Sequence, residues 1–191
     1  MPRGLARDHE EKRAALRKGA AAHFAERGFD RASMASVATA CGVSKALIYH
    51  YYDSKEALLF DILDNHLGDL AQAVATMPDA ACPEAHLRAL IHTILSEYRD
   101  ADAEHKLQID ALATLPPEMQ APLIDLQRQL VDTMRNALRD VGAGGDLRAV
   151  TMTVFGMLNW FYMWHRPGKG ISRDGYGELV TDLVLGGVRR L

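Results

Sequence analysis

Side chains suited to contacting nucleic acid are concentrated between Lys45 and His50 of this 191-residue chain. If this segment is a short helix, the side chains that face away from Ile48 are available to a partner. These are Lys45, Leu47, Tyr49 and His50. A lysine can donate to a guanine edge or a phosphate, a leucine can touch a thymine methyl group, and a histidine can do either. The pattern predicts non-covalent recognition of double-stranded DNA.

Two short helices joined by a tight turn would position these side chains. Ser33 and Ser44 are typical helix N-caps, so we expect helices over 34–40 and 45–51. Gly42 lies between them, where a turn needs left-handed backbone. Ala38 leaves room for the helices to cross, and a small core is expected from Val37, Cys41, Val43 and Ile48. This arrangement indicates a helix-turn-helix.

The run G-V-S-K-A-L-I-Y-H-Y-Y-D-S-K-E-A-L, residues 42–58, resembles the signature of TetR-family transcriptional regulators. The resemblance covers residues 12–60, with Ala46 and Tyr52 in place of the usual glycine and phenylalanine. It implies that Ser33, Ser44, Tyr49 and Lys55 hold DNA phosphates. Lys55 also lies at a helix start, where backbone N–H groups attract anions. Tyr51 is expected to contact a phosphate or to pack, and Tyr52 to lie in the core.

Charge is distributed unevenly along the chain. Residues 1–60 hold 10 Lys and Arg against 7 Asp and Glu, a balance of +3, and the remaining 12 and 18 give −6. A positive segment suits a DNA-binding domain. Arg3 and Arg7 suggest a basic arm over residues 1–8, either disordered or placed in a minor groove.

Composition predicts a cytoplasmic protein with no membrane partner. Only Cys41 and Cys82 are present, which suits a reducing compartment. The first twenty residues are charged, unlike a signal peptide. The longest apolar stretch, residues 150–164, is too short to span a bilayer.

The rest of the chain also has helical periodicity, so the predicted fold class is all-α with about nine helices. The expected helices are 9–27, one from the capping pair Asp53 and Glu56 to about residue 76, 86–99, 103–115, 118–141, 147–164 and 176–190. We expect a DNA-binding domain over residues 1–55 and a helical ligand-binding and dimerisation domain over 56–191.

The last two predicted helices carry more apolar surface than one neighbour can cover. Residues 147–164 are apolar nearly all round, which requires two packing partners. One is the domain itself, and the other is a second subunit in a homodimer. Burial within a monomer is the alternative. Two-fold symmetry would place two reading helices roughly 34 to 36 Å apart, the spacing of successive major grooves.

A second, shorter resemblance concerns a small-molecule effector. Residues 156–172, G-M-L-N-W-F-Y-M-W-H-R-P-G-K-G-I-S, are similar to the corresponding segment of TetR-type regulators of fatty-acid, steroid and aromatic-acid breakdown, several of which respond to acyl-CoA thioesters. The resemblance implies a pocket bordered by Asn159, Trp160 and Tyr162, with Arg99 or Arg128 meeting CoA phosphates. No cofactor is expected.

The sequence predicts a homodimeric repressor that a small-molecule ligand releases from a palindromic operator. Two other functions are the alternatives. A small metal-binding enzyme would use His86, His92 and His105 with Asp102 and Glu104, but the first two histidines fall on different helical faces. We therefore interpret these as surface histidines, with no catalytic or metal-binding residue. A helix-turn-helix that docks protein without binding DNA would lack salt-dependent DNA affinity.

Overall fold

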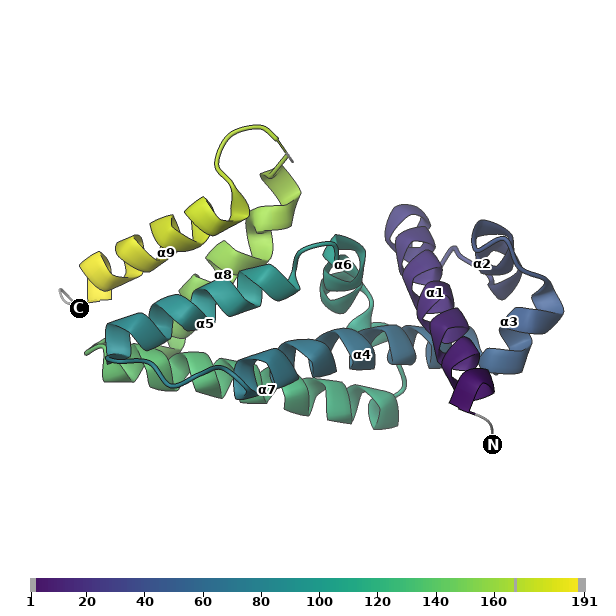
Figure 1. Cartoon of the computed structure of the whole chain (residues 1–191), viewed down its shortest axis with the longest axis horizontal. Helices are drawn as coiled ribbons and strands as arrows, with labels where there is room; N and C mark the ends of the chain where they lie inside the picture. Colours follow the sequence, from purple (N-terminus) through teal and green to yellow (C-terminus); the bar gives the residue numbers. More distant parts are fainter. Residues whose placement is uncertain (1–2, 167, 189–191) are drawn as a thin grey trace. The chain divides into compact units, whose positions relative to one another are not determined.

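The computed structural model describes residues 3–166 and 168–188. Within them the chain forms nine α-helices and one short 3₁₀ helix, with no strand and one isolated bridge between Arg166 and Lys169 (Figure 1). The helices are α1 (Arg3–Arg27), α2 (Met34–Ala40), α3 (Lys45–Tyr51), α4 (Lys55–Ala75), α5 (Pro83–Glu97), α6 (Asp102–Asp110), η1 (Leu112–Thr114), α7 (Pro117–Asp140), α8 (Leu147–Trp164) and α9 (Arg173–Val188). The all-α prediction is confirmed.

The helices divide into two compact units. The first unit comprises Met1–His66 and Ala103–Leu123, and the second comprises Leu67–Asp102 and Ile124–Leu191. The first unit therefore contains α1 to α3, the start of α4, α6, η1 and the start of α7. The second contains the remainder of α4 and α7 with α5, α8 and α9.

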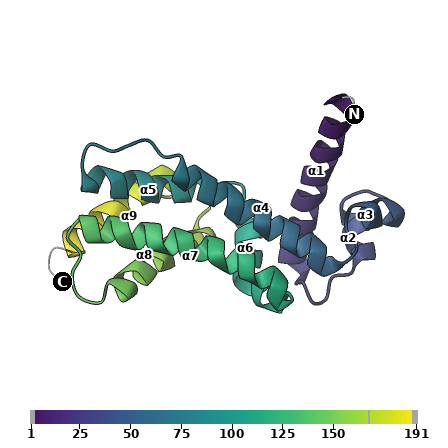
Figure 2. The ribbon, with the colours of Figure 1, turned by 90° about the horizontal axis from the view of Figure 1, so that it is seen from below.

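In the first unit the helix-turn-helix forms as the sequence predicts, with the predicted bounds of α2 and α3. Ser33 and Ser36 form a reciprocal capping box at the start of α2, and Ser44 caps α3. Gly42 has a φ of +67°, a left-handed conformation that favours glycine. Figure 2 shows α1, α2 and α3 grouped together. These caps satisfy backbone N–H groups that a short helix would otherwise leave without partners.

In the second unit α5 and α9 lie side by side in both views (Figures 1 and 2). Arg88 on α5 forms ion pairs with Glu178 and Asp182 on α9, the latter at 3.0 Å. His92 Nε2 lies 2.9 Å from a Glu178 carboxylate oxygen. Gly177 of α9 lies beside His92, and a Cβ atom at this position would lie 2.9 Å from the imidazole ring. The two helices can approach this closely because α9 has no side chain there.

Several local predictions were wrong. The arm predicted over residues 1–8 is part of α1 from Arg3 onward, and the Arg7–Glu11 pair at 2.9 Å supports the helix. The cap of α4 is Ser54, whose Oγ accepts from the Ala57 N–H at 3.0 Å, and not the predicted Asp53 and Glu56 pair. The predicted helix over 103–115 breaks into α6 and η1.

The interpretation of His105 as a surface histidine is also wrong. Its side chain is 1% exposed, and its ring lies edge-on to that of buried His66, with 6.1 Å between centroids. Among the described residues, no group of three His, Cys, Asp or Glu side chains could hold a metal ion. No described helix is long and apolar enough to cross a membrane.

Candidate nucleic-acid interface and effector site

The structure brings the predicted reading residues together on the outer face of α3. Ile48 is fully buried, whereas Lys45, His50 and Tyr49 are exposed, the last by 44%. The ammonium group of Lys45 lies 5.7 Å from the centre of the Tyr49 ring. Leu47 is half-buried and presents less surface than predicted. This face therefore offers a cation, a phenol and an imidazole to a partner.

The two capping serines lie at the starts of α2 and α3 and are both exposed. Ser33 Oγ accepts from the Ser36 N–H and Ser44 Oγ from the Leu47 N–H, each at 3.1 Å. A serine hydroxyl that accepts from the backbone can still donate its own hydrogen. Both residues can therefore cap a helix and bind a phosphate oxygen at the same time.

Lys55 makes intramolecular contacts that the sequence did not reveal. Its ammonium group donates to the carbonyl oxygens of Phe29 at 2.9 Å, Ala32 at 3.3 Å and Asp30 at 3.4 Å. It also lies 4.3 Å from the centre of the Phe29 ring. Lys55 thus holds the loop between α1 and α2 against the start of α4. Its predicted phosphate contact stays a prediction beside this structural role.

The two tyrosines at the end of α3 have different surroundings. Tyr51 is half-buried, with its ring 4.7 Å from that of His9 on α1. Tyr52 is buried, as predicted, and its hydroxyl donates to Asp61 at 2.6 Å. Burial is the main reason that the pKa of Tyr52 lies well above its ordinary value, and the contact with Asp61 raises it further. The Asp61 contact is a part of the site that the sequence reading missed.

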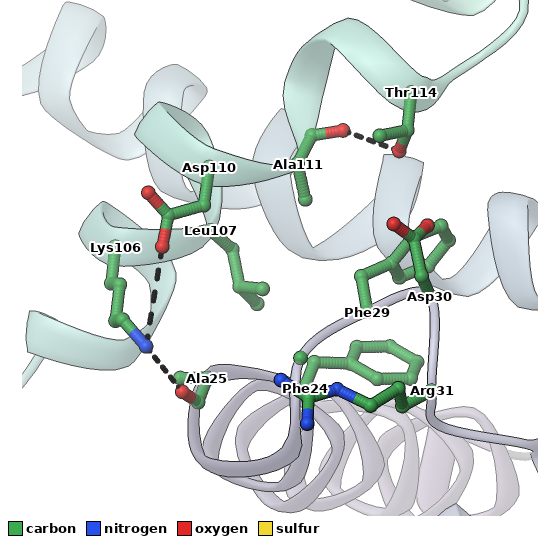
Figure 3. Close-up of a pocket in the computed structure, with 11 residues that line it drawn as sticks. Phe24, Ala25, Phe29, Asp30, Arg31, Lys106, Leu107, Asp110, Ala111 and Thr114 are labelled. Atoms are coloured by element: carbon green, nitrogen blue, oxygen red, sulfur yellow. Dashed lines mark hydrogen bonds and ion pairs between the residues drawn. The ribbon is translucent and has the colours of Figure 1, made fainter.

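A cavity of about 190 Å³ lies in the first unit between α1, the loop after it and α6 (Figure 3). Lys106 of α6 donates to the Ala25 carbonyl oxygen at 2.5 Å and lies 4.0 Å from the Asp110 carboxylate. The carbonyls in the last turn of a helix lack intrahelical partners. Lys106 therefore caps the end of α1 from another helix. Arg31 and Asp30 add one charge of each sign to the lining.

All five predicted effector residues belong to the second unit. Asn159 Oδ1 accepts from the buried Tyr98 hydroxyl at 3.0 Å, whereas Trp160 is 60% exposed and Tyr162 is half-buried. Arg99 lies 3.4 Å from Asp174, and Arg128 lies 2.9 Å from Asp125; both arginines are largely exposed. None of the five lines the cavity of the first unit or the hollow between α8 and α9 that is described below.

A cation that the sequence reading missed lies at the junction of α5, α8 and α9. The Arg173 side chain donates to the Leu95 carbonyl oxygen at 3.2 Å and lies 5.0 Å from the centre of the Phe161 ring. That ring stacks on His165 and Tyr176, with centroid distances of 4.4 and 4.6 Å. Burial lowers the pKa of Arg173. The cluster fixes the end of α8, within the segment that contains Asn159, Trp160 and Tyr162.

An apolar surface covers the exposed sides of α8 and α9. The large apolar side chains left exposed there are Met152, Trp160, Met163, Trp164, Leu179 and Leu183. A hollow of about 270 Å³ lies between the two helices and is lined by Ala149, Thr153, Met157, Leu183 and Gly187, among others. Soluble monomers rarely expose so many large apolar side chains together, and such patches mark interaction sites.

Two family models match the chain. Residues 16–62 match the model of "Bacterial regulatory proteins, tetR family", and residues 80–188 match that of "Tetracyclin repressor-like, C-terminal domain". A TetR-family regulator from Bordetella parapertussis is 33% identical and superposes with a TM-score of 0.83, over 95% of this chain and 98% of that one.

The names of two further relatives include a function or a ligand. The transcriptional repressor KstR2 of Rhodococcus jostii is 27% identical over an alignment 187 positions long, and the match covers 88% of this chain and 87% of the repressor. The structure of AibR with isovaleryl coenzyme A and operator DNA is similar in fold, with a TM-score of 0.79 and 24% identity over 90% of this chain and 96% of that one.

Proposed function

The chain belongs to the TetR family of bacterial regulatory proteins and is a ligand-responsive, DNA-binding transcriptional regulator, and we propose that it acts as a homodimeric repressor of a palindromic operator. The observation that supports operator binding best is the outer face of α3, where Lys45, Tyr49 and His50 are exposed on a capped helix. We propose residues 1–55 as the DNA-binding domain and 56–191 as the effector-binding and dimerisation domain.

Selection of bound DNA from a random-sequence pool tests this proposal. We expect an inverted repeat, with half-sites whose centres are roughly 34 to 36 Å apart, because a symmetric dimer reads successive major grooves. The selection should be repeated with CoA thioesters present. Enrichment of no sequence under either condition would favour a protein-docking module over an operator-binding protein.

Substitutions on α3 and at the start of α4 should distinguish residues that read bases from residues that bind phosphates. We expect Lys45→Ala to weaken operator binding about tenfold and to relax the base preference, since a specific base contact contributes roughly 1–3 kcal/mol of discrimination. Tyr49→Ala and Lys55→Ala should weaken binding to all sequences, and Lys55→Ala should also lower the melting temperature because of its three carbonyl contacts. Fluorescence anisotropy with operator and unrelated duplexes measures both effects.

The matched control is Lys169→Ala, which removes an exposed lysine from the second unit. It should change neither affinity nor base preference. If Lys45→Ala, Tyr49→Ala and Lys55→Ala all keep wild-type affinity, the face assigned to DNA is incorrect.

For the effector we propose a small apolar or acyl-CoA-type molecule. The AibR structure supports this class, because it contains isovaleryl coenzyme A. We propose that Asn159, Trp160 and Tyr162 border the pocket and that Arg99 or Arg128 meets the CoA phosphates. Both arginines have exposed side chains whose partners are surface carboxylates, so an anionic ligand can compete for them. The ligand would release DNA by binding better to a conformation that misplaces the reading helices.

A thermal-shift screen with CoA thioesters and the matching free acids tests this effector class. A ligand at 100 times its dissociation constant stabilises the folded state by about 2.7 kcal/mol. We expect this for at least one thioester and a reduced shift in Arg99→Ala or Arg128→Ala. Absence of stabilisation by every thioester would remove acyl-CoA compounds from the proposal, while a free acid that stabilises the protein would leave the small apolar class.

We assign no catalytic residue, metal or cofactor to the chain, since the relatives are regulators and a helix-turn-helix accounts for the exposed reading face. The alternative of a metal-binding enzyme requires stoichiometric zinc in the purified protein, which elemental analysis would detect. A cytoplasmic location is part of the proposal, because a repressor must reach chromosomal DNA.

A further inference from the structure

One carboxylate, that of Asp61 on α4, joins the end of the reading helix α3 to α1. The Tyr52 hydroxyl donates to Asp61 Oδ2 at 2.6 Å. Arg13 of α1 donates to both carboxylate oxygens, at 2.5 and 3.1 Å, and Arg17 Nη1 lies 3.4 Å from Oδ2. We propose that Asp61 is a positioning residue for DNA recognition: it anchors the reading helix through Tyr52 and withholds Arg13 and Arg17 from DNA phosphates.

The anchoring step follows from the short length and limited burial of α3. The helix has seven residues, of which Ile48 is the buried one, and a helix this short is not stable by itself. Tyr52 follows directly as its C-cap, and its ring is buried. The hydrogen bond to an ionised carboxylate fixes the outer end of that ring and is stronger than one between neutral groups. The orientation of the reading face therefore depends on Tyr52 and Asp61 together.

The withholding step follows from charge. The Asp61 side chain is 14% exposed and that of Arg17 is 15% exposed, so this pair is shielded from solvent. Arg17 also lies 3.4 Å from Glu10, which gives it a second acidic partner. Arginines that reach phosphates strengthen binding to every sequence alike. By holding two of them, Asp61 lowers this sequence-independent affinity, so that a larger share of the binding free energy comes from the bases that α3 reads.

This inference rests on the proposed DNA-binding function and predicts different effects for two variants. Asp61→Asn keeps an oxygen acceptor for Tyr52 but removes the charge that holds the arginines. We expect affinity for operator and unrelated duplex DNA to rise alike, by about fivefold, and the slope of log K against log salt to steepen by up to about 2, since each phosphate contact contributes about 0.9. Tyr52→Phe keeps the charges and removes the anchor. It should weaken operator binding about fivefold and leave unrelated DNA and the salt slope unchanged.

The experiment measures both affinities for each variant between about 50 and 300 mM salt, using the operator found by selection. Asp64→Asn is the matched control, because it removes the same charge from an exposed position three residues further along α4. It should leave both affinities within about twofold of wild type and the salt slope unchanged. Melting curves for every variant separate loss of the fold from loss of discrimination.

Failure of the inference and failure of the proposed function give different results. A wild-type protein that binds no DNA selectively contradicts the proposed function. The inference is overturned if the wild type is selective but Asp61→Asn changes neither the affinity for unrelated DNA nor the salt slope, and Tyr52→Phe leaves operator affinity unchanged. If Asp61→Asn does not fold, Arg13→Gln replaces it. If Asp61 already holds the Arg13 guanidinium, this variant should keep wild-type affinity for unrelated DNA. A marked loss of that affinity would show that Arg13 reaches a phosphate in the wild type and would contradict the inference.

Discussion

We expect Leu183→Arg to convert the protein from a dimer to a monomer and to weaken operator binding by at least about 100-fold, because tethering two binding modules typically contributes a factor of roughly 10² to 10⁴. Leu183 is 59% exposed on α9 and lines the hollow between α8 and α9. If a second subunit covers this surface, an arginine there buries a charge without a partner. Analytical ultracentrifugation measures the oligomeric state, and fluorescence anisotropy measures the operator affinity.

The control for this prediction is Ile109→Arg on α6. Ile109 is 52% exposed in the first unit, so the change in size, charge and exposed apolar area is similar. This variant should remain dimeric and bind the operator with wild-type affinity. A Leu183→Arg protein that stays dimeric would show that the interface does not use this part of α9. A wild type that is already monomeric would instead favour the alternative in which these helices serve a monomer.

The helix-turn-helix could be predicted in detail because its determinants are local. Capping serines, a left-handed glycine and the 3.6-residue period all act within a few residues, so the bounds of α2 and α3 and the burial of Ile48 and Tyr52 agreed with the structure. The start of α8 was predictable for the same reason, since Asp146 accepts from the N–H groups of Arg148 and Ala149. Local hydrogen bonding determines these helix ends.

The contacts between distant segments could not be predicted. Asp61 has the pattern of a solvent-facing residue on an amphipathic helix, and only the fold places it against Tyr52 and Arg13. His105 likewise has polar neighbours in sequence but packs against His66. Helical periodicity indicates which residues face inward, but it does not show which helices meet. The contact between the Tyr98 hydroxyl and Asn159 shows the same limit, because 61 residues separate the two in the sequence.

Acidification should destabilise the folded protein through His66. Burial lowers the pKa of His66 from 6.5 to about 4, and a hydrogen bond with Gln108 opposes this shift in part. Between these values the unfolded chain binds a proton that the folded chain does not, so stability is complete above pH 6.5 and falls as pH decreases. From about pH 7.5 to pH 5 we expect the free energy of unfolding to drop by about 2 kcal/mol through this residue. Urea denaturation at a series of pH values measures the change.

Comparison with two variants assigns the effect to His66, because other groups also titrate in this range. His66→Gln removes the titrating ring, so its free energy of unfolding should vary less with pH than that of wild type, by about 2 kcal/mol over the same interval. His50→Gln makes the same substitution at an exposed histidine and serves as the control for the change of side chain. Parallel curves for wild type and His66→Gln would mean that the His66 ring accepts a proton in the folded protein as readily as in the unfolded chain. In that case the packing of His66 against His105 would have to accommodate a charge, which a buried imidazole pair disfavours strongly.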